Sequence, residues 1–309
     1  MASPSIASDA SEPGASREWF LRSLTRQVAE GLFSVVFPSD CRVCGTPLTK
    51  ISRLPVCQDC LDEMLPIEEG LCGLCGERIF SAYATSGFED APRCALCQRI
   101  EPRFARAVAY GSYEGGLREL IHLLKYGGVR PAAKVLGRMM ADAVIALEDE
   151  FETDAVVVIP VPLHRGKLHQ RGFNQAELIA RSAVKVSAMG KRLRLCVHGL
   201  ERKRETAPQI GLTKHQRRLN LRGAFAVPDA ELVRGCEVLL VDDVYTTGAT
   251  AAECTRILLR AGAGKVWIAT VARTLKNSAQ HAEIRPEEVG NGSRESGAGE
   301  IAWARAVGQ

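Results

Sequence analysis

VLLVDDVYTTGAT spans Val238 to Thr250 and joins three features: an apolar run, two carboxylates and a small, hydroxyl-rich loop. The run Val238 to Val241 predicts a buried parallel strand, because it is short, rich in β-branched residues and followed by a turn. A helical pattern continues from the loop through Leu259. Strand, turn and helix in this order predict an α/β fold, in which ligands bind beyond the carboxyl ends of the strands.

The loop after the strand predicts an anion site. A tight turn into a helix N-terminus leaves backbone N–H groups unpaired and directed at one spot. Gly248 permits close approach of the backbone, and the threonines add hydroxyl donors. The candidate anion-binding residues are Thr246, Thr247, Gly248, Ala249 and Thr250.

The carboxylates before the loop, Asp242 and Asp243, suit sugar hydroxyls or a magnesium ion. Two alternatives remain open for this region. One is an ordinary turn in a Rossmann-like sheet. The other is the acidic end of a Walker B strand, which requires a GxxxxGK[ST] loop upstream, and the sequence contains none.

Length and composition limit the class of protein. A chain of 309 residues predicts one to three domains, and a net charge of +4 gives no case for nucleic acid from the whole chain. No apolar run approaches the length of a membrane helix, and no secretory signal is evident, so we expect a cytoplasmic protein with no membrane span and with reduced cysteines.

Eight of the eleven cysteines form four CxxC pairs with zinc-ribbon spacing. A redox role and an iron–sulfur cluster are alternatives, but four pairs so close together favour metal, and ribbon spacing favours zinc. We expect two closed, structural zinc sites, and an interleaved pairing of ligands remains open. One ion is expected on Cys41, Cys44, Cys57 and Cys60, and the other on Cys72, Cys75, Cys94 and Cys97.

Composition divides the chain into segments. Residues 1–16 are small and polar and are expected to be disordered, and so is the polar, glycine-rich tail 274–309. Residues 17–37 have helical apolar spacing, which predicts an amphipathic helix that packs on the protein or lies on a membrane surface. A cysteine-rich zinc-ribbon module over 38–100 then precedes the α/β domain, 101–273.

A second candidate ligand region follows a predicted buried strand, Ala155 to Ile159. The basic segment after Pro160 is punctuated by glycine, becomes helical at about Asn174 and could clamp a diphosphate, although a solvated loop is the alternative. Its candidate ligand-binding residues are Val161, Pro162, Arg165, Lys167 and Arg171. We add Lys125, in the last turn of a helix predicted over Gly115 to Tyr126, where it could instead be a helix-dipole partner.

A basic run extends from Lys191 to Arg222, with ten Lys or Arg residues against Glu201 and Glu205, a balance of +8. It could meet nucleic acid, a phosphate-rich ligand or only water. Aromatic residues for base stacking are missing from it, so direct DNA binding stays an open prediction.

These features resemble known families. VLLVDDVYTTGAT is similar to the phosphoribosyl-diphosphate motif of type I phosphoribosyltransferases, and the chain over residues 35–273 resembles the ComF family. The resemblance rests on the CxxC ribbons, LKYGG at 124–128, IPVPLHRGKLHQRGFNQAELIA at 159–180, TAPQIGLTKHQRRLNLRGAF at 206–225 and the acid-pair loop.

The resemblance implies a type I phosphoribosyltransferase fold, a mostly parallel sheet flanked by helices, behind a double zinc ribbon. It implies that Asp242 and Asp243 face the ribose hydroxyls and act as the catalytic pair, while the TTGAT loop cradles the 5′-phosphate. It also implies an association with a competence helicase and DNA-processing proteins in DNA uptake.

Three functions follow as hypotheses. The first is an enzyme that binds phosphoribosyl diphosphate with magnesium and transfers phosphoribosyl, as a pentosyltransferase, to an unknown acceptor. The second is a non-catalytic protein that senses a nucleotide or phosphoribosyl diphosphate in the same pocket. The third is a DNA-uptake adaptor that uses the zinc module and the basic run.

Overall fold

The structure is a computed structural model, and it describes residues 40–48, 52–67, 70–79, 92–206 and 214–275. The expected disordered segment 1–16, the expected helix 17–37 and nearly all of the expected tail lie outside the described residues. The described residues belong to one compact unit that extends to Leu275. Within them, no helix has the length and apolar character needed to span a bilayer.

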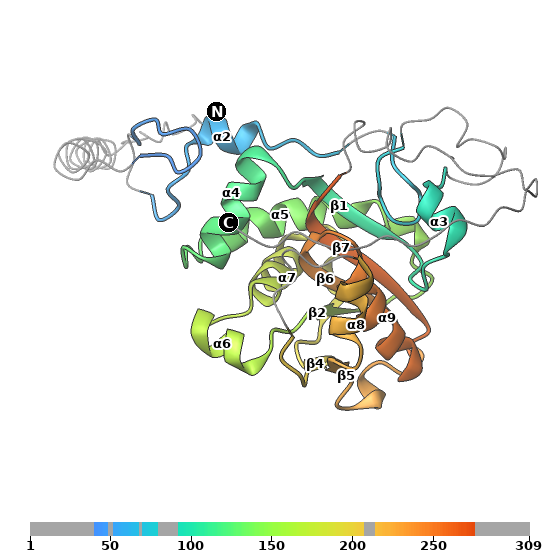
Figure 1. Ribbon diagram of the computed structural model, residues 1–309. Helices are drawn as coiled ribbons and strands as arrows, with labels where there is room; N and C mark the ends of the chain where they lie inside the picture. The colour runs from blue at the N-terminus through green and yellow to red at the C-terminus, as the bar shows by residue number, and fades with distance from the viewer. Residues whose placement is uncertain (1–39, 49–51, 68–69, 80–91, 207–213, 276–309) are drawn as a thin grey trace, which may run out of the picture. The chain divides into compact units, whose positions relative to one another are not determined.

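A five-stranded parallel sheet in the order β1-β7-β6-β2-β3 is flanked by helices (Figure 1). Its register pairs Val158 with Leu239 and Leu240 with Ile268, so β6 lies in the interior of the sheet. The strands are β1 (Ala107–Ser112), β2 (Val156–Pro160), β3 (Leu193–Leu195), β6 (Glu237–Tyr245) and β7 (Lys265–Arg273). A separate antiparallel pair is formed by β4 (Glu201–Arg202) and β5 (Phe225–Ala226).

Helices connect these strands, as parallel pairing requires. The longer ones are α4 (Gly115–Lys125), α5 (Ala132–Ile145), α6 (Arg165–Arg171), α7 (Gln175–Val186), α8 (Lys214–Leu221) and α9 (Ala249–Arg260). Short helices are α2 (Gln58–Asp62) and α3 (Ala95–Arg99), and the 3-10 turns are Glu148–Glu150, Gly190–Arg192 and Ala230–Leu232. The expected α/β architecture is therefore confirmed.

Successive side chains of a strand point to opposite faces of the sheet, and each face packs against its own hydrophobic core. Leu239 and Val241 of β6 face the core that contains α4, α5 and α7, whereas Val238 and Leu240 face the core that contains α9. Both faces of β6 are thus covered, which explains its continuous apolar sequence. Continued alternation places Asp243 on the α4 side and Asp242 on the α9 side.

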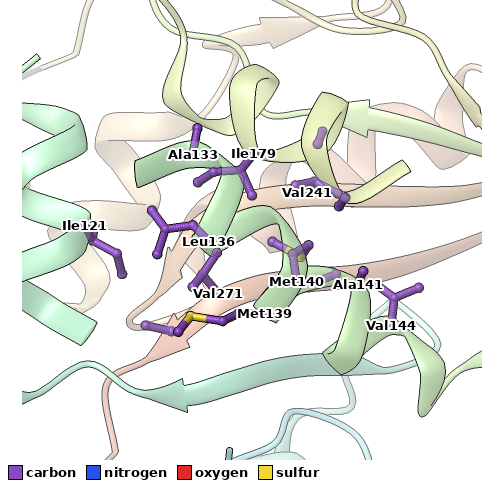
Figure 2. Close-up of a cluster of buried hydrophobic side chains, with 14 of the residues drawn as sticks. Ile121, Ala133, Leu136, Met139, Met140, Ala141, Val144, Ile179, Val241 and Val271 are labelled. Carbon is purple, nitrogen blue, oxygen red and sulfur yellow. The ribbon is translucent and has the colours of Figure 1, made fainter. Parts of the chain in front are cut away.

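The first core is closely packed around α5. Leu136 and Met140 of α5 lie beside Ile179 of α7, with Val241 and Val271 of the sheet beneath them (Figure 2). A Cβ at Gly137 would lie 2.3 Å from Cβ of Ser182, so the small residue allows α5 and α7 to approach. This packing fixes the sheet edge at which the polar residues gather.

Two local predictions were wrong. Residues 165–171 form the helix α6 where the sequence suggested a loop, with His164 Nδ1 accepting from the Gly166 N–H at 3.3 Å and Gly172 ending the helix at φ 76°. The helix lacks an apolar face, so periodicity could not reveal it. The strand β6 also continues past the acid pair to Tyr245, because β7 pairs with it as far as Arg273.

Candidate ligand site and cysteine clusters

A cavity of about 660 Å³ opens at the carboxyl ends of β2 and β6. Parallel α/β sheets bind ligands at this edge. Nine of the residues that the sequence nominated line it, although they come from three separate parts of the chain. They are Lys125, Val161, Pro162, Lys167, Arg171, Asp242, Asp243, Thr246 and Thr250.

The acid pair is electrostatically unequal. Asp243 accepts an ion pair from Lys125 at 2.8 Å, and both side chains are largely buried. Its second oxygen, Oδ2, is buried and has no hydrogen-bond partner among the described residues. Asp242 has no such ion pair within the part of the chain that the structure describes. Burial, followed by repulsion from Asp243, raises the pKa of Asp242 to about 7. Asp243 is therefore a carboxylate fixed in an ion pair, whereas Asp242 is a carboxyl group whose ionisation a bound cation would favour.

Lys125 is held charged in this arrangement. Burial acts to lower the pKa of Lys125, but attraction to Asp243 outweighs it and leaves the pKa above its ordinary value. The lysine ends α4, yet its side chain points to β6, so a helix-dipole role does not account for its position. The buried pair connects α4 to the strand that carries the acids.

The loop after β6 begins the helix α9. Gly248 is its N-cap residue with φ 73°, and a small cavity of about 20 Å³, enough for roughly one water molecule, lies under Gly248, Ala249 and Thr250. Thr246 and Thr250 line this cavity as well as the large one. Thr247 lines neither cavity, but its Oγ1 is buried and has no hydrogen-bond partner in the described part of the chain. The loop Thr246 to Thr250 thus brings hydroxyl groups close to a cavity about as large as one water molecule.

The space beside Gly248 is filled by a side chain of the preceding strand. A Cβ built at Gly248 would lie 2.2 Å from the hydroxyl oxygen of Tyr245, which supports the loop from below. The left-handed φ adds strain for any other residue. The glycine is required by the neighbouring ring as well as by the backbone.

The segment after β2 forms a second wall. The Val161 N–H donates to Val241 O at 2.8 Å, and Asn174 Nδ2 donates to Val161 O at 3.0 Å, so the turn through Pro162 is fixed from both sides. Lys167 and Arg171 extend from α6 to the cavity, with Arg171 5.6 Å above the Tyr126 ring. Arg165, by contrast, is exposed in the first turn of α6 and does not line the cavity.

Sequence reasoning missed several lining residues, of which Arg202 is the most important. Its guanidinium lies 5.4 Å from the centre of the Phe225 ring and donates to Thr206 Oγ1, and its Nε is buried without a partner. Burial lowers its pKa, yet an arginine stays charged. Thr206, the first residue of the matching stretch 206–225, also lines the cavity, and 207–213 lie outside the described residues.

The eight cysteines form two clusters, and each cluster combines two CxxC motifs that follow each other in the sequence. The first contains Cys41, Cys44, Cys57 and Cys60, and the second contains Cys72, Cys75, Cys94 and Cys97. The two have the same local structure. The Gly45 N–H donates to Cys41 O at 2.9 Å and the Gly76 N–H to Cys72 O at 2.8 Å, both at positive φ. Each repeat ends in a short helix, α2 or α3.

The clusters fit zinc. Tetrahedral bonds of ~2.3 Å to sulfur place sulfur atoms about 3.8 Å apart. The Sγ pairs Cys41–Cys60, Cys44–Cys57 and Cys75–Cys94 are 3.9, 3.7 and 3.7 Å apart. Four thiolates close each site, so an ion bound there would be structural.

Similar proteins are found by sequence, although no family model matches the chain. DNA utilization protein YhgH of Escherichia coli O6:H1 is 30% identical over 240 residues, which cover 77% of this chain and 98% of that protein. Competence protein F of Haemophilus influenzae is 29% identical over 228 residues, or 70% and 96% of the two chains. Competence protein ComFC of Bacillus subtilis is 27% identical over 207 residues, or 67% and 79%.

The chain belongs to the ComF family. Its parallel sheet with helices on both faces, preceded by the two cysteine clusters, agrees with the architecture expected for that family. The positions of the domain boundaries remain predictions.

Two solved structures resemble part of this ComF family chain. One is titled as the allosteric regulatory enzyme of purine biosynthesis, with 23% identity and a TM-score of 0.29 over 46% of this chain and 26% of the other. The other is the glutamine phosphoribosylpyrophosphate amidotransferase from B. subtilis complexed with ADP and GMP, with 26% identity and a TM-score of 0.27 over 45% and 26%.

Proposed function

We propose that the cavity binds phosphoribosyl diphosphate, or a nucleotide, together with magnesium, and that the protein is a phosphoribosyltransferase with an acceptor yet to be identified. The supporting observation is that three kinds of polar group meet at one cavity. An acid pair, a hydroxyl-rich loop at a helix N-terminus and a basic wall surround one cavity of about 660 Å³, at the sheet edge where such folds bind ligands.

Each wall suits a different part of the ligand. The loop Thr246 to Thr250 offers backbone N–H groups and hydroxyls to the 5′-phosphate. Asp242 and Asp243 offer carboxylate oxygens to the ribose hydroxyls. Lys167 and Arg171 face the space left for the diphosphate, beside the fixed turn at Val161 and Pro162. Arg165 is not assigned a contact, because it is exposed outside the cavity.

The charges of the cavity favour an anionic ligand that carries a cation. Lys125, Lys167, Arg171 and Arg202 oppose Asp242 and Asp243. The unpartnered Oδ2 of Asp243 and the neighbouring Asp242 carboxylate are the oxygen ligands that magnesium prefers. Magnesium bound there would neutralise charge on the diphosphate.

Transfer would proceed by substitution at the anomeric carbon. The bond from this carbon to the diphosphate oxygen breaks, and the diphosphate leaves with the electron pair. A lone pair of the acceptor forms the new bond, and the acceptor then loses a proton to solvent. Positive charge that develops on the ribose is stabilised by the carboxylates, so the site acts by positioning and electrostatics.

Turnover distinguishes this proposal from a ligand sensor with the same pocket. The experiment incubates the protein with phosphoribosyl diphosphate, magnesium and a panel of nucleobases, and measures released diphosphate. Release that depends on one acceptor and is lost in Asp242→Asn supports an enzyme. Tight binding of phosphoribosyl diphosphate without release under any condition would instead favour the sensor.

A role in DNA uptake is proposed from the names of the relatives, which refer to competence and DNA utilization. On this view the partners include a competence helicase and DNA-processing proteins. A pull-down from competent cells with the cysteine clusters intact, and again after removal of metal, tests whether the clusters take part. Recovery of none of these proteins in either sample would contradict the proposal.

A further inference from the structure

The second cysteine cluster is connected to the phosphate loop through Arg273, the last residue of β7. Arg273 is 3% exposed, and a buried guanidinium requires acceptors. Two acceptors come from the turn that carries Cys75. The Arg273 side chain donates to Cys75 O and to Glu77 Oε2, the latter at 3.0 Å, and its Nη2 lies 3.8 Å from Cys75 Sγ.

The same guanidinium holds Tyr245. Its Cζ lies 4.5 Å from the centre of the Tyr245 ring, a cation–π contact in a water-poor setting. The Phe104 ring packs against Tyr245 in an edge-to-face arrangement, with ring centres 6.4 Å apart, and shares a core with Cys72, Cys75 and Cys97. The Tyr245 ring is therefore bordered by Arg273, which contacts Cys75, and by a residue of the core that holds the second cluster.

Tyr245 in turn supports the loop. It lines the small cavity together with Thr246 and Thr250, and its hydroxyl occupies the space next to Gly248 in which a Cβ would lie 2.2 Å away. A change in the ring position would move the first turn of α9. Contacts thus run without a gap from Cys75 to Arg273, Tyr245 and Gly248.

The first cluster has a different environment. Cys41 and Cys60 share a core with Leu117 of α4, while Cys72, Cys75 and Cys97 share a core with Leu240 and Ala249. Among the described residues, the hydrogen bonds of the first four cysteines stay within their own repeat. The first cluster therefore serves as an internal control for the second.

We propose that Arg273 and Tyr245 are positioning residues for the phosphate loop, and that through them metal at the second cluster controls how tightly the loop binds an anion. The inference rests on the proposed function, since it assumes that the loop binds phosphate. Coupling between two sites is reciprocal, so a ligand in the loop must also strengthen retention of metal at the second cluster.

The test measures zinc release from the zinc-loaded, full-length chain to a colorimetric chelator. The probes are inorganic phosphate and phosphoribosyl diphosphate with magnesium, and binding of each is measured separately by calorimetry. Cys44→Ser, which removes a ligand of the first cluster, identifies the release phase of that cluster. We expect either probe to slow release from the second cluster and, at equilibrium with the chelator, to raise the zinc affinity of that cluster by about fivefold or more, the lower end of ordinary coupling between sites. The first cluster should be unchanged in both measurements.

Variants locate the connection. Arg273→Met should weaken phosphate binding and make zinc release independent of ligand, and Arg273→Lys should restore part of both. Arg192→Met is the matched control, because Arg192 also lies over an aromatic ring, Phe151 at 5.5 Å, and donates to three backbone carbonyls, but it contacts neither the cluster nor the loop. Arg192→Met should keep the ligand dependence.

Each outcome decides the matter. If the parent protein binds a probe but neither release phase changes, or both change equally, the inference is overturned and the proposed function stands. If the parent protein binds neither probe, both the inference and the proposed function are contradicted. If Arg273→Met does not fold, the ligand dependence of the parent protein and of Arg273→Lys still gives the answer.

Discussion

Lys125 Nζ lies 2.8 Å from Asp243 Oδ1, and the ion pair joins the end of α4 to the strand that carries the acid pair. The two side chains are 15% and 7% exposed, so each charge depends on the other for its stability in the fold. The other oxygen, Asp243 Oδ2, is buried and has no hydrogen-bond partner among the described residues. Position and charge of the acid pair thus depend on a residue more than a hundred positions earlier in the chain.

Lys125→Met should lower stability strongly, because it leaves the Asp243 carboxylate buried and unpaired. We expect a loss of about 3 kcal/mol in the free energy of unfolding, measured by urea titration at pH 7. The double variant Lys125→Met, Asp243→Leu should recover most of this loss and still bind no phosphoribosyl diphosphate. A single variant as stable as the parent protein would show that the pair is not buried in solution.

Asp242→Asn should raise stability at neutral pH. Because the pKa of Asp242 rises from 3.8 to about 7 on folding, the folded state holds the proton more tightly. The ionised Asp242 carboxylate lowers the free energy of unfolding. This destabilisation is absent below pH 4, grows as the pH rises, and is complete above pH 7. We therefore expect the variant to exceed the parent protein by at least about 1 kcal/mol at pH 8 and to match it near pH 4.

Thermal unfolding across this pH range measures the difference. Asp243→Asn is the contrasting control: it leaves Lys125 without its carboxylate partner and should be less stable than the parent protein at pH 8. Equal stability of Asp242→Asn and the parent protein at pH 8 would contradict the assigned environment of Asp242.

Gly248→Ala should lose both stability and phosphate binding. The left-handed φ costs an alanine about 1–2 kcal/mol, and its Cβ would overlap the Tyr245 hydroxyl. Tyr245→Phe removes that hydroxyl oxygen, so the double variant should recover part of the stability. Calorimetry and thermal unfolding check the two effects, and a stable alanine variant with full affinity would disprove the arrangement of loop and ring.

Two zinc ions should be found in each chain, and Cys44→Ser should lower the number to one. The reason is that the two groups of four sulfur atoms are separate, so one can lose its metal while the other retains it. Elemental analysis of protein purified without added metal measures the content. A disulfide map that links these cysteines in the native protein, or the absence of zinc, would rule out the sites.

Much of the fold could be predicted from local patterns. The apolar runs of β2 and β6 and the spacing of the CxxC pairs depend on residues close together in the sequence, and these predictions agree with the structure. The helix α6 could not be predicted, because its sequence RGKLHQR has no apolar stripe and is recognised only by its caps. Sheet pairing, not sequence, determines the end of β6 at Tyr245.

Most of the site was predictable where a sequence motif or a basic segment after a strand marked it, but not where a single residue reaches the cavity from another element. Asp242, Asp243 and the loop follow each other, whereas Arg202 reaches the cavity from the β4–β5 pair and shows no distinctive pattern within the basic run. The different environments of Asp242 and Asp243 also depend on the tertiary structure. Strand alternation sends them to different faces, and only one face holds Lys125.

The central claim, a cavity for phosphoribosyl diphosphate and magnesium, is tested most directly by calorimetric titration of the parent protein and of Asp242→Asn. Asp242→Asn is the decisive variant because it keeps the Lys125–Asp243 pair. We predict binding to the parent protein that requires magnesium, and an affinity at least about tenfold weaker in the variant, a loss of about 1.4 kcal/mol, despite its greater stability. Absence of binding to the parent protein, or equal affinity of the two proteins, would contradict the account.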